Sequence, residues 1–193
     1  MPRGFIAVVS GLPRSGTSLM MQMLAAGGIP PLTDNLRPPD ESNPRGYFEF
    51  EPVKRLRSDR SWLDQAAGHS VKIIHVLVRE LPADGRFQYR VILMKRSMDE
   101  ILASQRVMLE RQDKASVNEA TLATIFPTQL AQLETWLAAQ PGFSFLAVDY
   151  HRVLKEPLQI AREVSAFLDG NLNLEAMAAA VDPMLYHQRA RKD

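Results

Sequence analysis

A short loop bounded by two glycines constrains the fold of this chain more than any other feature of the sequence. This glycine loop, GLPRSGTS at residues 11–18, follows an apolar run at residues 5–10 that is typical of a buried parallel strand. A helix is expected from about Thr17 to the Gly27-Gly28 pair, because apolar residues recur there at helical spacing. Strand, glycine loop and helix in this order predict a turn that binds a phosphate group.

The glycine loop carries groups suited to phosphate. It has the GxxxxG spacing of a Walker A motif, but Thr17 stands in place of the usual lysine. Glycines let the backbone amides turn inward, and an arginine with three hydroxyl side chains can donate hydrogen bonds. The residues assigned to phosphate binding are Gly11, Arg14, Ser15, Gly16, Thr17 and Ser18. The alternative is a tight turn in which Ser15 or Thr17 only caps the helix.

Two departures from the Walker pattern speak against an ordinary ATPase or GTPase. One is the missing lysine of the loop. The other is the absence of an Asp at the end of a second apolar run, residues 89–94, where an acid that holds magnesium is expected. The sequence therefore favours a phosphate-containing donor that is bound without a metal.

The rest of the chain alternates apolar runs with helical sequence. Residues 71–78, 89–94 and 143–148 are predicted as buried strands, and each precedes a helix. This alternation predicts an α/β fold with a doubly wound, mainly parallel sheet flanked by helices, in which ligands bind beyond the carboxyl ends of the strands. With 193 residues, 46% of them hydrophobic, the chain is expected to form a single domain over residues 1–193.

Several local signals mark the expected helices. Capping boxes at residues 97–100 and 116–119 are predicted to open two of them, and Pro127 is expected to kink or divide the second. Pro157 is placed as the first residue of a later helix that ends near Asp169-Gly170.

Residues 30–52 contain six prolines and show no clear period. Such a loop is either a lid or substrate-binding loop or a plain surface connection, and the sequence leaves both open. A basic helix is expected to follow at about residues 53–67. Its cations either attract an anionic acceptor or are ordinary exposed charges; they are Lys54, Arg55, Arg57 and Arg60.

The composition excludes several classes of protein. The 23 Lys and Arg against 22 Asp and Glu give a net charge of +1, so nucleic acid is not an expected partner and any anion site must be local. There is no Cys, and the four His show no metal-ligand spacing. The N-terminal apolar run is too short for a signal sequence, and no stretch approaches the roughly 20 apolar residues of a membrane span. A cytoplasmic protein with no membrane partner is expected.

The loop GLPRSGTSLM resembles the 5'-phosphosulfate-binding loop of sulfotransferases, commonly PKSGTT, and is closest to the PRSGTT version of tyrosylprotein sulfotransferases and many bacterial relatives. That family binds 3'-phosphoadenosine 5'-phosphosulfate (PAPS) and transfers its sulfuryl group to a hydroxyl or amine. The resemblance implies a P-loop fold of the sulfotransferase type and PAPS as donor. It also implies 3'-phosphoadenosine 5'-phosphate (PAP) as product, no metal, and a small-molecule or glycan acceptor that the sequence does not identify.

A second element of that family is a strand that ends in an arginine and is followed eight residues later by a serine, the two holding the 3'-phosphate. In VILMKRSMDEILASQ these positions are Arg96 and Ser104. The alternative is a surface ion pair for Arg96 and a packing role for Ser104. Two further stretches, FLAVDYHRVLKEP with IAREVSAFLDG and NPRGYFE, resemble structural parts of the family.

The resemblance also suggests catalytic residues. Arg14 is the candidate that stabilises charge, although a guanidinium does not act as a general acid. His75 in VKIIH loosely resembles the KTH segment in which lysine and histidine assist transfer, but in a strand Lys72 and His75 would face opposite sides, so a structural role is the other reading. Glu49, within NPRGYFE, is preferred over Glu51 as a general base, and either could instead be a solvated loop charge.

Three functions remain open from the sequence. They are a PAPS-dependent sulfotransferase, a P-loop kinase or NTPase, and a non-catalytic nucleotide-binding protein. Arg96 with Ser104 separates the first from the second, because a nucleoside triphosphate has no 3'-phosphate for them to bind. The basic residues at 189–192 either touch that phosphate or belong to a solvated tail.

Overall fold

The computed structural model describes residues 4–40, 43, 45–111 and 118–182. The basic positions at 189–192 lie outside these residues. In chain order the helices and strands are β1 Phe5–Gly11, α1 Thr17–Ala26, η1 Glu51–Arg55, α2 Leu63–Ala66, β2 Ser70–Lys72, η2 His75–Glu80, β3 Gln88–Lys95, α3 Met98–Arg111, α4 Glu119–Ala139, β4 Phe143–Asp149, α5 Tyr150–Lys155, α6 Pro157–Phe167 and α7 Leu174–Ala179. The two η elements are 3-10 helices.

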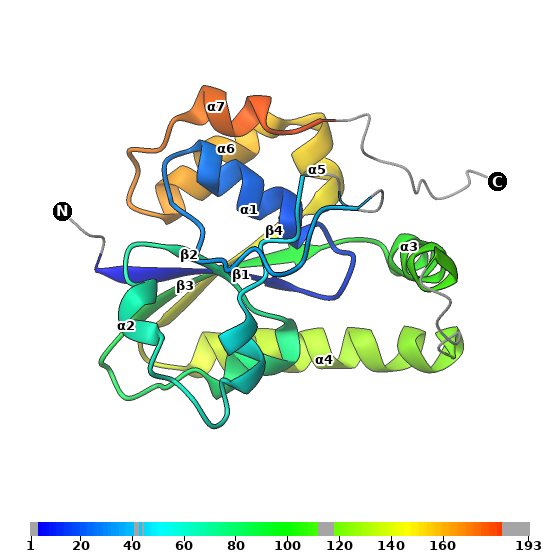
Figure 1. The fold of residues 1–193 in the computed structure, drawn as a ribbon, viewed down its shortest axis with the longest axis horizontal. Helices are drawn as coiled ribbons and strands as arrows, with labels where there is room; N and C mark the ends of the chain where they lie inside the picture. Colours follow the sequence, from blue (N-terminus) through cyan, green and yellow to red (C-terminus); the bar gives the residue numbers. More distant parts are fainter. Residues whose placement is uncertain (1–3, 41–42, 44, 112–117, 183–193) are drawn as a thin grey trace.

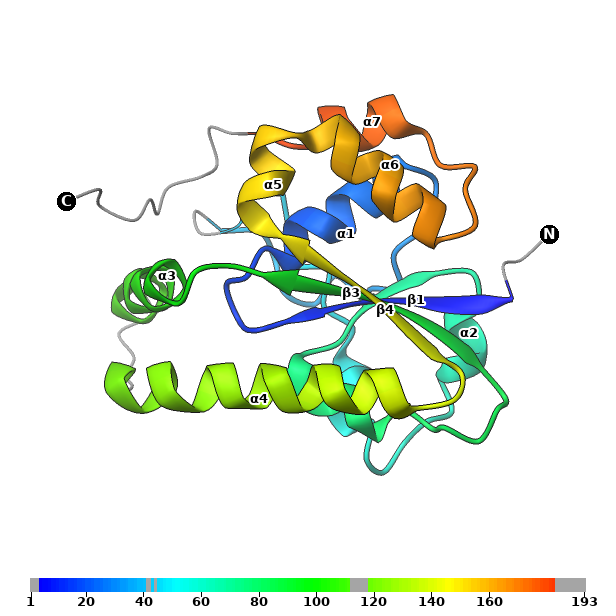
Figure 2. The same cartoon turned by 180° about the vertical axis from the view of Figure 1, so that it is seen from behind.

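The described strands form one parallel sheet in the order β2-β1-β3-β4. Helices α1, α5, α6 and α7 cover one face, and α2 and α4 cover the other (Figures 1 and 2). Because β1 lies between β2 and β3, the loops that leave all three strands meet at one edge of the sheet. The predicted α/β fold with a parallel sheet and helices on both faces is confirmed.

Each face of the sheet has its own apolar core. Alternate residues of β1 point to opposite faces, as the pleat requires: Val9 packs under α1 and α6, whereas Val8 packs with α2 and α4. Residues of β1 are buried along its whole length, which is the pattern of a central parallel strand. The sheet therefore provides a rigid base for the loops at its carboxyl edge.

Helix α3 occupies a special place at that edge. It lies beyond the carboxyl ends of the strands, beside the N-terminal part of α4 (Figures 1 and 2). Because α3 follows β3 after only a short turn, its first residues remain next to the loop that leaves β1. This arrangement brings α3 against the glycine loop.

The prediction of a strand at residues 71–78 was wrong beyond Lys72. The strand β2 ends at Lys72, and the 3-10 helix η2 begins at His75. His75 and Val78 are both buried and lie three residues apart, a spacing that puts side chains on one side of a 3-10 helix but not of a strand. The run is apolar, but beyond Lys72 its buried residues follow the three-residue spacing of a 3-10 helix and not the alternation of a strand.

The continuous basic helix predicted at residues 53–67 was also wrong. The structure has only the short η1 and α2 there. Between them the carboxylate of Asp59 accepts hydrogen bonds from the amide and the hydroxyl of Ser61, at 3.0 and 2.7 Å. Such local bonds compete with helical ones, so the segment turns instead of continuing as a helix.

Helix α4 can be compared with its prediction at two points. It begins at Glu119, one residue after Asn118, whose side chain accepts from the amide of Thr121 at 3.2 Å, whereas the predicted box has Ser116 as its first residue. Residues 116 and 117 of that box lie outside the described residues. The helix is not divided at Pro127. Pro127 is exposed, so water can satisfy the carbonyl that its ring leaves without a donor.

The remaining boundaries agree with the sequence. Helix α1 ends at Ala26 before Gly27, α3 begins directly after Ser97, and α6 begins at Pro157. None of the helices in the described ranges has the length and apolar character needed to cross a lipid bilayer.

Candidate functional site

The glycine loop is folded tightly at the end of β1. Gly11 has φ 151° and Gly16 has φ 99°, a region that favours glycine. A Cβ on Gly11 would lie 2.5 Å from Ser15 Oγ and 2.7 Å from the carbonyl oxygen of Met94, and one on Gly16 would overlap the ring of Tyr150. Only glycine fits either position. The loop thus forms the close turn that backbone amides need in order to face an anion.

Ser15 takes part in this turn through its backbone. Its amide donates to the carbonyl of Leu12 at 3.2 Å, and its side chain is fully buried. Its hydroxyl, which lies beside Gly11, has no hydrogen-bond partner among the described residues. The side chains of Arg14, Thr17 and Ser18 are less buried and are placed better to meet a ligand.

Arg14 joins the glycine loop to α3. Its Nε donates a hydrogen bond to Ser104 Oγ at 2.9 Å. Its backbone is in the left-handed region at φ 68°, which is uncommon for a residue with a Cβ and costs about 1 kcal/mol or more. Burial lowers the pKa of Arg14 from its usual value, but a guanidinium remains charged. Two residues that sequence motifs selected separately therefore meet in the structure.

Arg96 lies behind the loop in a buried ion pair. Its Nε donates to Glu100 Oε2 at 2.8 Å, and the two side chains are 6% and 2% exposed. Its Nη1 donates to the carbonyl oxygen of Arg14 at 3.0 Å, and its guanidinium lies 4.5 Å from the ring centre of Tyr150. An ion pair was one expected reading of Arg96, but it is an interior pair and not a surface one.

Lys72 is a site residue that the sequence did not single out. Its Nζ donates to Ser18 Oγ at 3.0 Å and to the carbonyl oxygen of Tyr47 at 2.8 Å. Burial lowers the pKa of Lys72 to about 8. The segment VKIIH contains the signal, but the predicted strand through residue 78 places Lys72 and His75 on opposite faces. In the structure β2 ends at Lys72 and leaves its side chain at the carboxyl edge.

Part of the proline-rich loop folds over this edge. Residues 33–40, 43 and 45–51 are called the strap below. They place the Tyr47 carbonyl against Lys72, and Ser18 Oγ donates to the same oxygen at 3.4 Å. The guanidinium of Arg37 stacks 3.3 Å from the ring centre of Tyr47. The Tyr47 hydroxyl donates to the Asp40 carboxylate at 2.7 Å. The strap therefore contacts the glycine loop directly.

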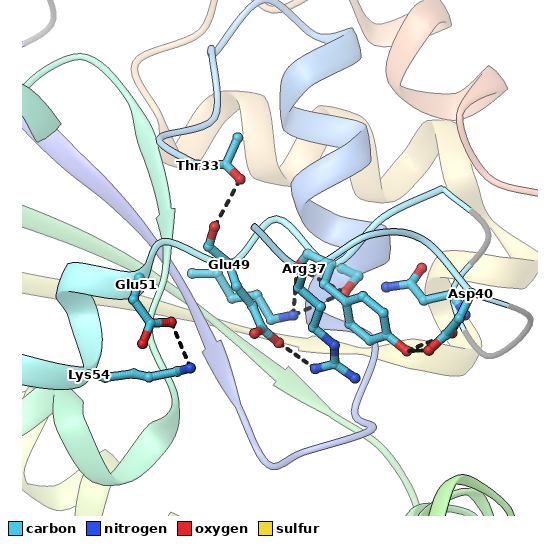
Figure 3. A network of polar contacts seen from close by, with 10 residues as sticks. Thr33, Arg37, Asp40, Glu49, Glu51 and Lys54 are labelled. Atoms are coloured by element: carbon cyan, nitrogen blue, oxygen red, sulfur yellow. Dashed lines mark hydrogen bonds and ion pairs between the residues drawn. The ribbon is translucent and has the colours of Figure 1, made fainter. Parts of the chain in front are cut away.

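The two glutamates of the strap differ in their surroundings (Figure 3). Glu49 accepts from Arg37 Nη1 at 2.8 Å, and its backbone oxygen accepts from Thr33 Oγ1 at 2.9 Å. Its negative charge raises the pKa of Lys72 against the effect of burial. Glu51 instead pairs with Lys54 at 2.7 Å on the exposed side. Glu49 is the one that lies within electrostatic reach of Lys72.

His75 packs against α4. Its Nε2 is 2.8 Å from Gln129 Oε1, and its ring meets that of Phe126 edge-on with centres 6.0 Å apart. Burial lowers the pKa of His75 against the hydrogen bonds with Gln129 and Gly11, which favours the neutral ring. The contacts with α4 favour a structural role, one of its two expected readings, and the backbone of Gly11 in the glycine loop is also a hydrogen-bond partner of His75.

Positive charge is concentrated at the site although the chain as a whole has a net charge of only +1. Burial is the largest cause of the lowered pKa of both Arg14 and Lys72. Tyr47 and Asp40 raise the pKa of Arg14 while Arg96 and Arg37 lower it, and Glu49 raises the pKa of Lys72 while Arg37 and Arg14 lower it. Cations that weaken one another's protonation are close enough to act on a common anion. The edge beside the glycine loop is therefore suited to a polyanionic ligand.

No family model matches the sequence, and no curated protein matches it. Solved structures do match the fold. A sulfotransferase from Mycobacterium tuberculosis aligns with a TM-score of 0.60 and 17% identity over 92% of this chain and 71% of its own. The sulfotransferase domain of a Synechococcus olefin synthase aligns with a TM-score of 0.59 and 15% identity, over 94% of this chain and 78% of its own. A sulfotransferase from Alicyclobacillus acidocaldarius aligns with a TM-score of 0.53 and 14% identity, over 94% of this chain and 87% of its own. The chain has a sulfotransferase-like fold.

Proposed function

We propose that this chain is a sulfotransferase that uses PAPS to transfer a sulfuryl group to a hydroxyl or amine of a small molecule or glycan. The observation that carries the proposal is the contact of Arg14 with Ser104 beside Arg96. It unites the residues suited to a 5'-phosphosulfate with those suited to a 3'-phosphate at one edge of a sulfotransferase-like sheet.

The residues present fit such a donor. Gly11 and Gly16 leave room that any Cβ would fill, so the loop backbone can approach an anion closely. Loop amides with Arg14, Thr17 and Ser18 would hold the 5'-phosphosulfate, and Ser104 with Arg96 would hold the 3'-phosphate. PAPS supplies the activated sulfuryl group, and the protein's part is to place and polarise it.

The chain's own groups supply the rest of the chemistry. Arg14, bonded to Ser104, and Lys72, bonded to Ser18, offer positive charge beside the glycine loop, which would stabilise negative charge that develops on transferred and leaving oxygens. Glu49 is the proposed base for the acceptor's proton, because it lies near Lys72 and is about one third exposed. His75, buried against α4, is the weaker candidate.

Titration of nucleotides into the wild-type protein tests the proposal. We expect PAP to bind without magnesium, and to bind more tightly than ATP with magnesium, because only PAP has a 3'-phosphate for Ser104 and Arg96. Calorimetry measures both affinities. Replacement of Ser104 by Ala is expected to lower the affinity for PAP by about tenfold, the effect of losing one hydrogen bond to a charged group.

Other results would select the alternatives. ATP binding that requires magnesium and does not change in Ser104→Ala would indicate a kinase or NTPase. PAP binding with no sulfuryl transfer from PAPS to any of a broad panel of hydroxyl and amine acceptors would indicate a nucleotide-binding protein without turnover.

Lys72 gives a prediction for pH. Its ammonium is charged below about pH 8 and becomes a neutral amine above it, so PAP affinity is expected to fall as the pH rises from about 7 to 9, by up to about tenfold per pH unit. Calorimetric titration across this range measures the change. In Lys72→Met the affinity should be low and nearly constant with pH.

Lys54→Met is the matched control for this prediction. Lys54 is exposed and pairs with Glu51, which holds the pKa of Lys54 above its usual value. Its replacement should leave the pH dependence of the wild type intact. An unchanged pH dependence in Lys72→Met would show that another group titrates.

A further inference from the structure

One carboxylate at the site is buried and has no part in the roles assigned so far. Among the described residues, Glu100 is the only acidic side chain that is fully buried, with 2% of it exposed. A carboxylate away from water is costly unless hydrogen bonds and positive charge compensate it. Its position therefore has to be explained by its partners.

Glu100 meets two nitrogen-bearing side chains. Its Oε2 accepts from Arg96 Nε at 2.8 Å and lies 3.2 Å from His151 Nε2. Arg96 and Glu100 are four residues apart, and Arg96 precedes α3 while Glu100 lies in its first turn. The other side of the guanidinium is limited by the ring of Tyr150. Arg96 is thus fixed in one orientation by groups from α3 and α5.

That orientation determines what Arg96 does to the glycine loop. With Nε turned to Glu100, Nη1 reaches the carbonyl oxygen of Arg14 at 3.0 Å. Arg14 is in the uncommon left-handed conformation, which persists only where surrounding contacts hold it. The bond from Arg96 is such a contact.

Helix α3 therefore holds Arg14 at two points. Ser104 accepts from the Arg14 side chain, and Glu100 acts on the Arg14 backbone through Arg96. Glu100 and Ser104 are four residues apart and share one face of α3. One helix face thus fixes both the backbone and the guanidinium of the loop arginine.

We propose that Glu100 is a positioning residue: it orients Arg96 against the Arg14 carbonyl and so maintains the loop conformation that presents Arg14 to a 5'-phosphate group. The proposal rests on the proposed function only for the identity of the nucleotide. It gives Arg96 a role in binding the 5' end of a nucleotide, in addition to the contact with a 3'-phosphate.

Replacement of Glu100 by Gln tests this inference, because Gln keeps the size and removes the charge. Calorimetry with PAP and with adenosine 5'-monophosphate, which lacks the 3'-phosphate, is expected to show both affinities reduced by a similar factor of about tenfold, the effect of one weakened charge-assisted bond. Asp99→Asn is the matched control. Asp99 is exposed and lies in the same first turn of α3, so its replacement removes the same charge near the helix N-terminus. It should bind both nucleotides as the wild type does.

Two results would overturn the proposal. One is unchanged affinity for both nucleotides in a folded Glu100→Gln protein. The other is a loss confined to PAP, which would place the effect of Glu100 at the 3'-phosphate alone. A melting curve of each variant separates these effects from unfolding, since a merely structural residue would lower Tm without changing the affinity of the folded molecules.

Hydrogen exchange keeps this test independent of the proposed function. If the wild type binds neither nucleotide, the PAPS proposal fails, and the backbone amides of residues 11–18 decide the role of Glu100. They should exchange faster in Glu100→Gln than in the wild type and in Asp99→Asn, and equal rates would refute the role proposed for Glu100.

If Glu100→Gln does not fold, Arg96→Lys replaces it in this experiment, since a lysine pairs with Glu100 but has no second nitrogen for the Arg14 carbonyl. The same increase in exchange is expected.

Discussion

Replacement of Arg14 by Ala is expected to reduce affinity for PAP by about a hundredfold, or about 3 kcal/mol, the upper range for a hydrogen-bonded charged group. The fold should remain intact, because Ala has the same Cβ restriction as Arg at φ 68° and the bond from Arg96 goes to the backbone of residue 14. Calorimetry gives the affinity, and a thermal melt gives the stability.

Arg55→Ala is a suitable control, because Arg55 is an exposed arginine of η1. It should leave both affinity and Tm unchanged. A large fall in Tm for Arg14→Ala would mean that the side chain stabilises the loop itself and does not primarily serve a ligand. Unchanged PAP affinity with normal Tm would remove Arg14 from the site.

Gly16→Ala is expected to destabilise the protein by about 3 to 4 kcal/mol and to abolish nucleotide binding. The residue combines φ 99° with direct overlap of any Cβ with the Tyr150 ring, and this ring is confined by the guanidinium of Arg96. The left-handed backbone costs about 1 kcal/mol, and the overlap adds the cost of overpacking. Urea unfolding measures the change in the free energy of unfolding.

Gly28→Ala isolates the cost of the left-handed backbone from that of the overlap. Gly28 has nearly the same φ, 98°, but a Cβ there would meet nothing within 4 Å. We expect this variant to lose only about 1 kcal/mol and to keep full nucleotide affinity. Equal losses for Gly16→Ala and Gly28→Ala would contradict the close approach of Tyr150 to the loop.

The glycine loop was predictable because its signal is local. The spacing of Gly11 and Gly16 and the apolar run before them specify strand, turn and helix within about twenty residues. The parallel sheet followed from the same reasoning applied to residues 89–94 and 143–148, which are β3 and β4 almost to the residue. The family resemblance added Arg96 and Ser104, and the structure brings both to the loop.

The contacts between distant segments were not predictable in this way. Lys72 meets Ser18 because β2 ends after three residues and pairs with β1 only as far as Val9. An apolar run does not show where such an edge strand stops. Glu100 reads as an ordinary first-turn acid of a capping box, and only the tertiary structure shows that it is buried against Arg96 and His151.

The Tyr47 carbonyl has a consequence for how a ligand enters. Lys72 and Ser18 already donate to that oxygen, so an arriving anion competes with a polar group of the protein itself. Under the proposed function, binding would be an exchange of hydrogen-bond acceptors, and the affinity for a phosphate would reflect the difference between the phosphate and the carbonyl. A neutral carbonyl is a weaker hydrogen-bond acceptor for an ammonium than a phosphate is. The exchange would therefore discriminate against uncharged ligands in the donor site, whatever molecule receives the sulfuryl group.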